Sequence, residues 1–162
     1  MLKTCVIVAD RARARLFVTV TPAERFVGTA LVELQELEDL TDPEGELTGR
    51  ELFSSSRSGT NRSPHGANFE YDDHREGHRE ETERRFAKRV ALATKQLLIR
   101  ESASRLVLVV EPHMLGILRQ ELGDRLPGVA SRLELAEDLS WHTPQRILET
   151  LERRGALSPT GT

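Results

Sequence analysis

The sequence predicts a single α/β domain built on a mixed five-stranded sheet. Two short continuous apolar runs, CVIV at residues 5–8 and LVLVV at residues 106–110, are typical of central strands buried on both faces. A helical pattern separates them, and further helix and strand patterns follow the second run. The 162 residues suit one domain that buries roughly 68–70% of its unfolded surface. We therefore expect one domain over residues 1–154 and a frayed tail over 155–162.

Three strands are expected near the start of the chain. The first covers residues 4–9. The second covers 13–20, where arginines alternate with apolar residues, and the third covers 30–35, with one face in solvent. Because short links join these strands, they favour an antiparallel meander.

A segment without sustained periodicity follows, over residues 39–77. Loops of this length in compact domains are usually functional or disordered. This one holds Arg57 and Arg62 with few acidic neighbours, and Phe69 and Tyr71 follow them. Arginine near aromatic rings suits a flexible nucleic-acid contact, whereas a surface loop without fixed structure is the competing interpretation.

The second half of the chain reads as α-β-α-β-α. A helix is expected over residues 78–100, with a core stripe formed by Phe86, Val90, Ala93 and Leu97. The run at 106–110 then forms a strand parallel to the first, and Pro112 opens a helix. A fifth strand surrounds Leu133, and Thr143 caps the last helix. With right-handed crossovers, the simplest strand order is 3-2-1-4-5, with helices flanking the sheet, which is the ribonuclease H-like arrangement.

Composition excludes several classes of protein. No apolar run approaches the ~20 residues of a membrane span, and a single cysteine excludes an internal disulfide framework. The first residues lack a signal-peptide pattern, so we expect a cytoplasmic protein. The net charge of −3 shows that the molecule is not basic all over. Any polyanion contact must therefore come from a local patch.

Five segments that together span nearly the whole chain resemble the bacterial family of host attachment proteins. They are VADRARARLF (8–17), LVELQELEDLTDPE (31–44), RRFAKRVA (84–91), RLVLVVEPHMLGILRQEL (105–122) and EDLSWHTP (137–144). That family is similar to the middle domain of archaeal and eukaryotic class-1 peptide release factors and their ribosome-rescue relatives. The resemblance implies the same domain shape and an association with ribosomes or RNA.

The resemblance does not extend to release-factor chemistry. In release factors the loop before the long helix carries a Gly-Gly-Gln tripeptide that enters the peptidyl-transferase centre. Here the corresponding loop, RSGTNRSPHGANFEY (57–71), has no adjacent glycines and no glutamine. The sequence therefore argues against hydrolysis of peptidyl-tRNA.

Arg11, Arg13 and Arg15 form the strongest candidate contact with nucleic acid. On one face of an extended chain their guanidinium groups would lie roughly 6–7 Å apart, near the phosphate spacing of an extended strand. Ion pairing with acids such as Glu33 on a neighbouring strand is the competing interpretation.

A metal-dependent hydrolase is the rival from another class. Asp10 and Glu111 follow adjacent strands, so their carboxylates could hold Mg²⁺, with Asp138 and the helical Glu83 as additions. However, nucleases of this fold usually place the first acid inside the strand. Asp10 could equally be a turn residue.

A second metal hypothesis concerns His74 and His78, which are four residues apart and could share one helix face. Solvated side chains at a helix entry are the competing interpretation. We expect Cys5 to be a buried hydrophobe, because its strand is apolar.

Taken together, these observations favour a non-catalytic domain without a cofactor that binds RNA or the ribosome. The hydrolase and a protein-interaction or host-contact module are the alternatives. The sequence does not determine an oligomeric state.

Overall fold

The computed structural model describes residues 3–21, 32–43 and 67–157. Within them one mixed sheet has the strand order β3-β2-β1-β4-β5, as the sequence predicted. β1 is antiparallel to β2 and parallel to β4, β2 is antiparallel to β3, and β4 is parallel to β5. The strands are β1 (Thr4–Ala9), β2 (Arg13–Val20), β3 (Glu33–Thr41), β4 (Arg105–Val110) and β5 (Ser131–Leu135).

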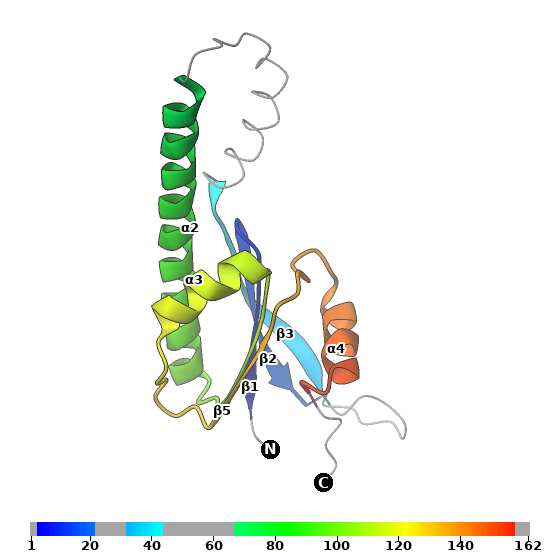
Figure 1. The fold of residues 1–162 in the computed structure, drawn as a ribbon. Coiled ribbons are helices and arrows are strands. Elements are labelled where there is room, and N and C mark those ends of the chain that lie inside the picture. Colours follow the sequence, from blue (N-terminus) through cyan, green and yellow to red (C-terminus); the bar gives the residue numbers. More distant parts are fainter. Residues whose placement is uncertain (1–2, 22–31, 44–66, 158–162) are drawn as a thin grey trace.

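Helices cover both faces of the sheet (Figure 1). α2 (Ala67–Arg100) and α3 (Pro112–Leu122) pack on one face, and α4 (Pro144–Arg153) packs on the other. Alternate residues of β1 serve the two cores. Cys5 and Ile7 face α2 and α3, whereas Val6 and Val8 face α4. Every β1 residue is buried, which explains the continuous apolar run.

The third strand differs from the prediction: it covers Glu33–Thr41, not 30–35. Its pairing with β2 shifts register between Leu16 and Phe17, where Leu37 is the extra residue of a β-bulge. The leucines of β3, at 34, 37 and 40, recur every third residue in the sequence, which the extra residue of the bulge accommodates. A strand with this spacing does not show the alternation by which strands are recognised in sequence.

The long helix begins at Ala67, not near residue 78. Figure 1 shows its N-terminal part extending past the end of the sheet. The apolar stripe recognised in the sequence, from Phe86 to Leu97, marks only the part of α2 that packs on the sheet. Because β3 also runs to Thr41, both ends of the predicted loop 39–77 are regular structure. Residues 44–66 lie outside the described part.

The first three residues of the predicted frayed tail, 155–157, are part of the folded domain. Gly155, at φ +70°, turns the chain at the end of α4. The amide of Ala156 then donates to the Leu151 carbonyl at 2.8 Å, and Ala156 and Leu157 are buried in the α4 core. Only residues 158–162 of that predicted tail lie outside the description.

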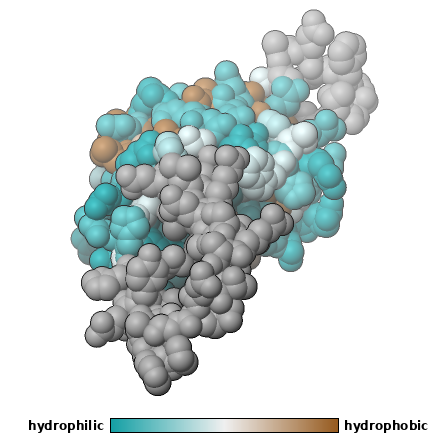
Figure 2. Space-filling view, turned by 90° about the horizontal axis from the view of Figure 1, so that it is seen from above, coloured by the Kyte–Doolittle hydropathy of each residue, from teal (hydrophilic) through white to brown (hydrophobic). Residues whose placement is uncertain are grey.

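None of the helices in the described ranges is long and apolar enough to cross a membrane. Seen from above, the described surface is mainly hydrophilic, with small hydrophobic areas (Figure 2).

Candidate functional site

The carboxyl ends of β1 and β4 lie side by side, with Ala9 opposite Val110. From there the chain leaves in different directions, into the turn before β2 and into α3. In α/β sheets, ligands tend to bind where neighbouring parallel strands end and their connections diverge. The predicted acids Asp10 and Glu111 stand at this edge, which makes it the candidate site.

Asp10 is a turn residue. One carboxylate oxygen accepts hydrogen bonds from the amides of Ala12 and Arg13, at 2.8 and 2.7 Å. Its other oxygen lies 2.7 Å from the hydroxyl of Ser140, in the segment between β5 and α4. The carboxylate therefore closes the β1–β2 turn and ties it to the distant segment before α4.

Asp138 belongs to the same network. One of its oxygens accepts from the Ser140 amide at 3.1 Å and lies 2.6 Å from the Ser140 hydroxyl. Ser140 is fully buried, and its hydroxyl lies between the two carboxylates. Asp10 and Asp138, the latter a possible addition in the hydrolase hypothesis, are linked through the hydroxyl of Ser140.

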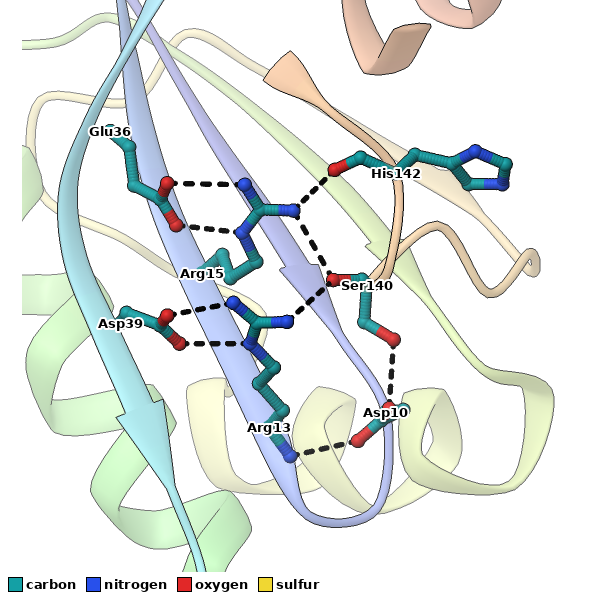
Figure 3. A network of polar contacts seen from close by, with 7 residues as sticks. All are labelled: Asp10, Arg13, Arg15, Glu36, Asp39, Ser140 and His142. Carbon is teal, nitrogen blue, oxygen red and sulfur yellow. Dashed lines mark hydrogen bonds and ion pairs between the residues drawn. The ribbon is translucent and has the colours of Figure 1, made fainter.

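Arg13 is held on two sides (Figure 3). Its guanidinium donates to both carboxylate oxygens of Asp39 on β3, at 3.0 and 2.8 Å, and to the Ser140 carbonyl at 3.3 Å. These hydrogen bonds are the main reason why the pKa of Asp39 is lowered and that of Arg13 is raised. The pair is therefore a doubly hydrogen-bonded, charge-assisted contact.

Arg15 repeats the pattern deeper in the fold. It donates to both oxygens of Glu36 on β3, at 2.6 and 3.1 Å, and to the carbonyls of Ser140 and His142, at 3.2 and 2.5 Å. Its side chain is 7% exposed and its guanidinium lies 5.1 Å from the ring of Phe17. A phosphate could reach this group only by displacing Glu36.

The structure therefore provides acidic partners for all three predicted contact arginines. Arg13 and Arg15 are hydrogen-bonded to Asp39 and Glu36, not to Glu33, and Arg11 lies at ion-pair distance from two other acids. Binding of RNA by Arg13 or Arg15 stays a prediction, but it would require breaking these pairs.

Arg11 points to the opposite face of the sheet, toward α2 and α3. Its guanidinium lies 3.6 Å from Glu83 on α2 and 3.6 Å from Glu111, distances of ion pairs but too long for hydrogen bonds. Glu83 is 5% exposed and lies 2.7 Å from Nε2 of His113. Glu111 caps α3 by accepting from the amides of His113 and Met114.

These contacts give structural roles to the four acids of the hydrolase hypothesis. Asp10 closes a turn, Asp138 holds Ser140, Glu111 caps a helix and Glu83 pairs with His113. Among the described residues, no group of three or more His, Cys, Asp and Glu side chains is placed to hold a metal ion.

Cys5 offers no nucleophile. It is fully buried, and burial raises the pKa of its thiol to about 11.

Other predicted site residues fall partly or wholly outside the description. The α2 backbone places His74 and His78 one turn apart, and His78 is exposed, but the side chain of His74 is outside the described residues. Arg57 and Arg62 lie outside them as well. The metal hypothesis for the histidines and the loop contact therefore stay predictions.

The exposed side of α2 carries a further pattern of charge. Residues 84–100 of α2 contain six basic side chains and no acidic one. The six are Arg84, Arg85, Lys88, Arg89, Lys95 and Arg100, and all are exposed. A running sum of charge along the sequence would have revealed this stretch.

A family model described as "Protein required for attachment to host cells" matches residues 5–151. No curated protein sequence matches the chain.

Proposed function

The chain belongs to the family of proteins required for attachment to host cells, and from this premise we propose that it is a non-catalytic domain that binds RNA, on the ribosome or free. The observation that carries the proposal is the basic face of α2, defined as its six exposed basic side chains between residues 84 and 100. Two of the six are paired with acids, Arg85 with Glu81 and Arg100 with Glu38, and the other four still give this stretch an excess of positive charge on a chain whose net charge is −3. Such a patch attracts polyanions even when the whole molecule is acidic.

Within the basic face, Arg84 and Lys88 are the side chains best placed to bind phosphate. Neither makes a hydrogen bond or ion pair with another described residue, whereas Arg85 pairs with Glu81 and Arg100 pairs with Glu38. Arg84 and Lys88 are one helical turn, or about 6 Å, apart along the axis. They can therefore contact one phosphate or two successive phosphates without breaking an internal pair.

The likeness to release-factor middle domains supports the same proposal. α2 is 34 residues long, or about 51 Å, and projects beyond the sheet at its N-terminal end, as a helix that reaches into a binding groove would. The absence of a Gly-Gly-Gln tripeptide and the structural use of the four acids favour binding over hydrolysis.

The experiment is a salt titration of binding to fluorescently labelled single-stranded RNA, with co-sedimentation on ribosomes alongside. We expect affinity to fall steeply with salt. The Arg84→Ala/Lys88→Ala variant should reduce the slope of log K against log salt by about 1.4, because each single-strand phosphate contact contributes about 0.7.

The matched control is Arg125→Ala/Arg153→Ala, one position before β5 and one at the end of α4. It removes the same charge from exposed positions outside α2. Equal loss of affinity in both variants would show attraction by overall charge only. Unchanged binding by the α2 variant, or no binding by the wild type at low salt, would refute the proposal.

A second candidate is a protein partner on the same face of α2. Leu92 and Ile99 are 59% and 71% exposed and seven residues apart, so they lie on the same side of the helix. If Leu92→Ser/Ile99→Ser abolished ribosome binding but left binding to isolated RNA unchanged, α2 would be docking on protein.

A further inference from the structure

Trp141 is the most exposed large hydrophobic residue of the described part, at 74%, and the only tryptophan in the chain. It lies between Ser140, which is buried, and His142, which is partly exposed, in the segment that leads from β5 into α4. No structural role in the core explains it, because its side chain contributes to neither hydrophobic core cluster.

The backbone around Trp141 is held unusually firmly for a surface segment. On its N-terminal side, the Ser140 carbonyl accepts from Arg13 and Arg15, and the Ser140 amide and hydroxyl bind carboxylates. On its C-terminal side, the His142 carbonyl accepts from Arg15 and the His142 amide donates to the Leu139 carbonyl at 3.1 Å. The hydrogen bonds that Figure 3 shows at Ser140 and His142 therefore hold the backbone on both sides of Trp141, whose indole is exposed.

The ring itself is positioned by a cation. The guanidinium carbon of Arg13 lies 5.1 Å from the Trp141 ring centroid, and Asp39 and the Ser140 carbonyl fix that guanidinium in place. Because the side chain is still 74% exposed, most of the indole remains open to a ligand. A cation on one face draws electron density from the ring, which disfavours a second cation on the other face. A flat π-system is the better occupant.

The surroundings also argue for a small flat ligand and against a protein surface. Aromatic hot spots of protein interfaces lie at the centre of closely packed patches. The other exposed large hydrophobics among the described residues belong to other elements: Leu92 and Ile99 to α2, on the opposite side of the sheet, and Leu133 to β5. Among the described residues, Trp141 therefore has no other exposed large hydrophobic residue in its own segment.

We propose that Trp141, backed by Arg13, is a stacking site for a single unpaired nucleobase. The inference rests on the proposed function, because it concerns a base of the RNA that the basic face of α2 would bind. The two contacts contribute differently to the free energy of RNA binding. The basic face of α2 attracts phosphates, an effect that depends on salt, and Trp141 stacks on a base, an effect that depends on the base.

The test uses the intrinsic fluorescence of Trp141, which reports this site alone because the chain has no other tryptophan. The full chain is titrated with a single-stranded oligoadenylate and, separately, with AMP, with correction for absorbance. We expect saturable quenching by both. Trp141→Ala should weaken oligoadenylate binding, measured by anisotropy, about 5- to 150-fold, the loss of one stacked base, with the salt slope unchanged. Trp141→Phe should retain part of the affinity.

The outcomes distinguish the stacking site at Trp141 from RNA binding by α2. RNA binding without quenching, and unaffected by Trp141→Ala, would overturn the stacking site and leave the function of α2 standing. Quenching by AMP without RNA binding would support the stacking site and refute the proposed function. If neither quenching nor RNA binding were observed, the stacking site and the proposed function would both be refuted. Loss of ribosome co-sedimentation in Trp141→Ala, without quenching by either probe, would overturn the stacking site in favour of a protein contact. Circular dichroism of Trp141→Ala checks that the variant is folded.

Discussion

Two groups of basic side chains in this protein share their chemistry and differ in what surrounds them. Arg13 and Arg15 point to the α4 face of the sheet, where β3 supplies a carboxylate to each and the segment before α4 supplies carbonyls. Arg84 and Lys88 stand on the outer face of α2, where no described residue pairs with them. The first group holds the fold together, and the second is available to a partner. Availability therefore depends on the neighbouring element, not on the residue type.

The largest effect expected from this comparison is on stability, at Arg15. Arg15→Met removes a buried guanidinium and leaves Glu36 and two carbonyls without their donor. We expect the free energy of unfolding to fall by about 2–4 kcal/mol. Urea unfolding followed by circular dichroism measures it. Labelling of the buried Cys5 thiol under native conditions should accelerate in parallel, since Cys5 reacts only after opening.

The control for Arg15 is the double variant Arg15→Met/Glu36→Leu, which removes both partners of the pair. It should recover part of the lost stability, because no uncompensated charge remains. If Arg15→Met were as stable as the wild type, Arg15 would not contribute to the stability of the fold and would not belong to the first group.

A smaller effect, dependent on pH, is expected at Arg13. Arg13 lowers the pKa of Asp39 below its unfolded value of about 3.9, so the pair stabilises the fold fully above that pH and loses its effect as pH falls through the folded pKa. Arg13→Gln should therefore cost up to about 1 kcal/mol at pH 7, because Asp39 is 42% exposed and the pair is partly screened. The difference from the wild type should shrink below about pH 4.

The measurement for Arg13 is the free energy of unfolding from pH 7 to pH 3 for both proteins. Arg119→Gln serves as a comparison. Arg119 lowers the pKa of Glu134 in the same way, and Glu134 lies on β5, at the opposite edge of the sheet from β3. A difference for Arg13→Gln that stays constant with pH would mean that the loss does not come from the charge of Asp39.

The smallest effect on stability is expected on α2. Arg84→Ala and Lys88→Ala should change the free energy of unfolding by less than about 0.5 kcal/mol, because both side chains are exposed and unpaired among the described residues. Thermal unfolding measures it. A loss as large as that of Arg15→Met would place these side chains in the structural group and remove the physical basis for their role in binding.

Much of the fold could be predicted because it depends on local patterns. The apolar runs at β1 and β4 require burial on both faces, and short links and crossover rules then restrict the strand order. The errors concern the ends of elements, where the local hydrophobic pattern is interrupted or absent. The bulge at Leu37 interrupts the alternation of β3, so its predicted bounds were wrong. The apolar stripe of α2 marks only the part that packs on the sheet, and Gly155 turns the chain so that Ala156 packs into the core.

The candidate site could be predicted only in part. Asp10, Arg13, Arg15 and Asp138 were all named from the sequence, but their partners were not. Ser140 and Asp39 are 130 and 26 residues from Asp10 and Arg13, respectively, and no local pattern couples them. The basic stretch of α2 is visible in the sequence, and the helical spacing of its core stripe places Arg84, Arg85 and Arg89 on the outer face, as the structure shows.

The sequence by itself determined the class of fold, the order of the strands and the membership of the family, because hydrophobic periodicity and local turn chemistry act over a few residues. Only the tertiary structure decided which charges are used internally. The register between β2 and β3 brings Glu36 and Asp39 against the arginines, and packing of the segment before α4 brings Ser140 to the same place. Ion pairing depends on such distances between elements, whereas burial of an apolar strand does not.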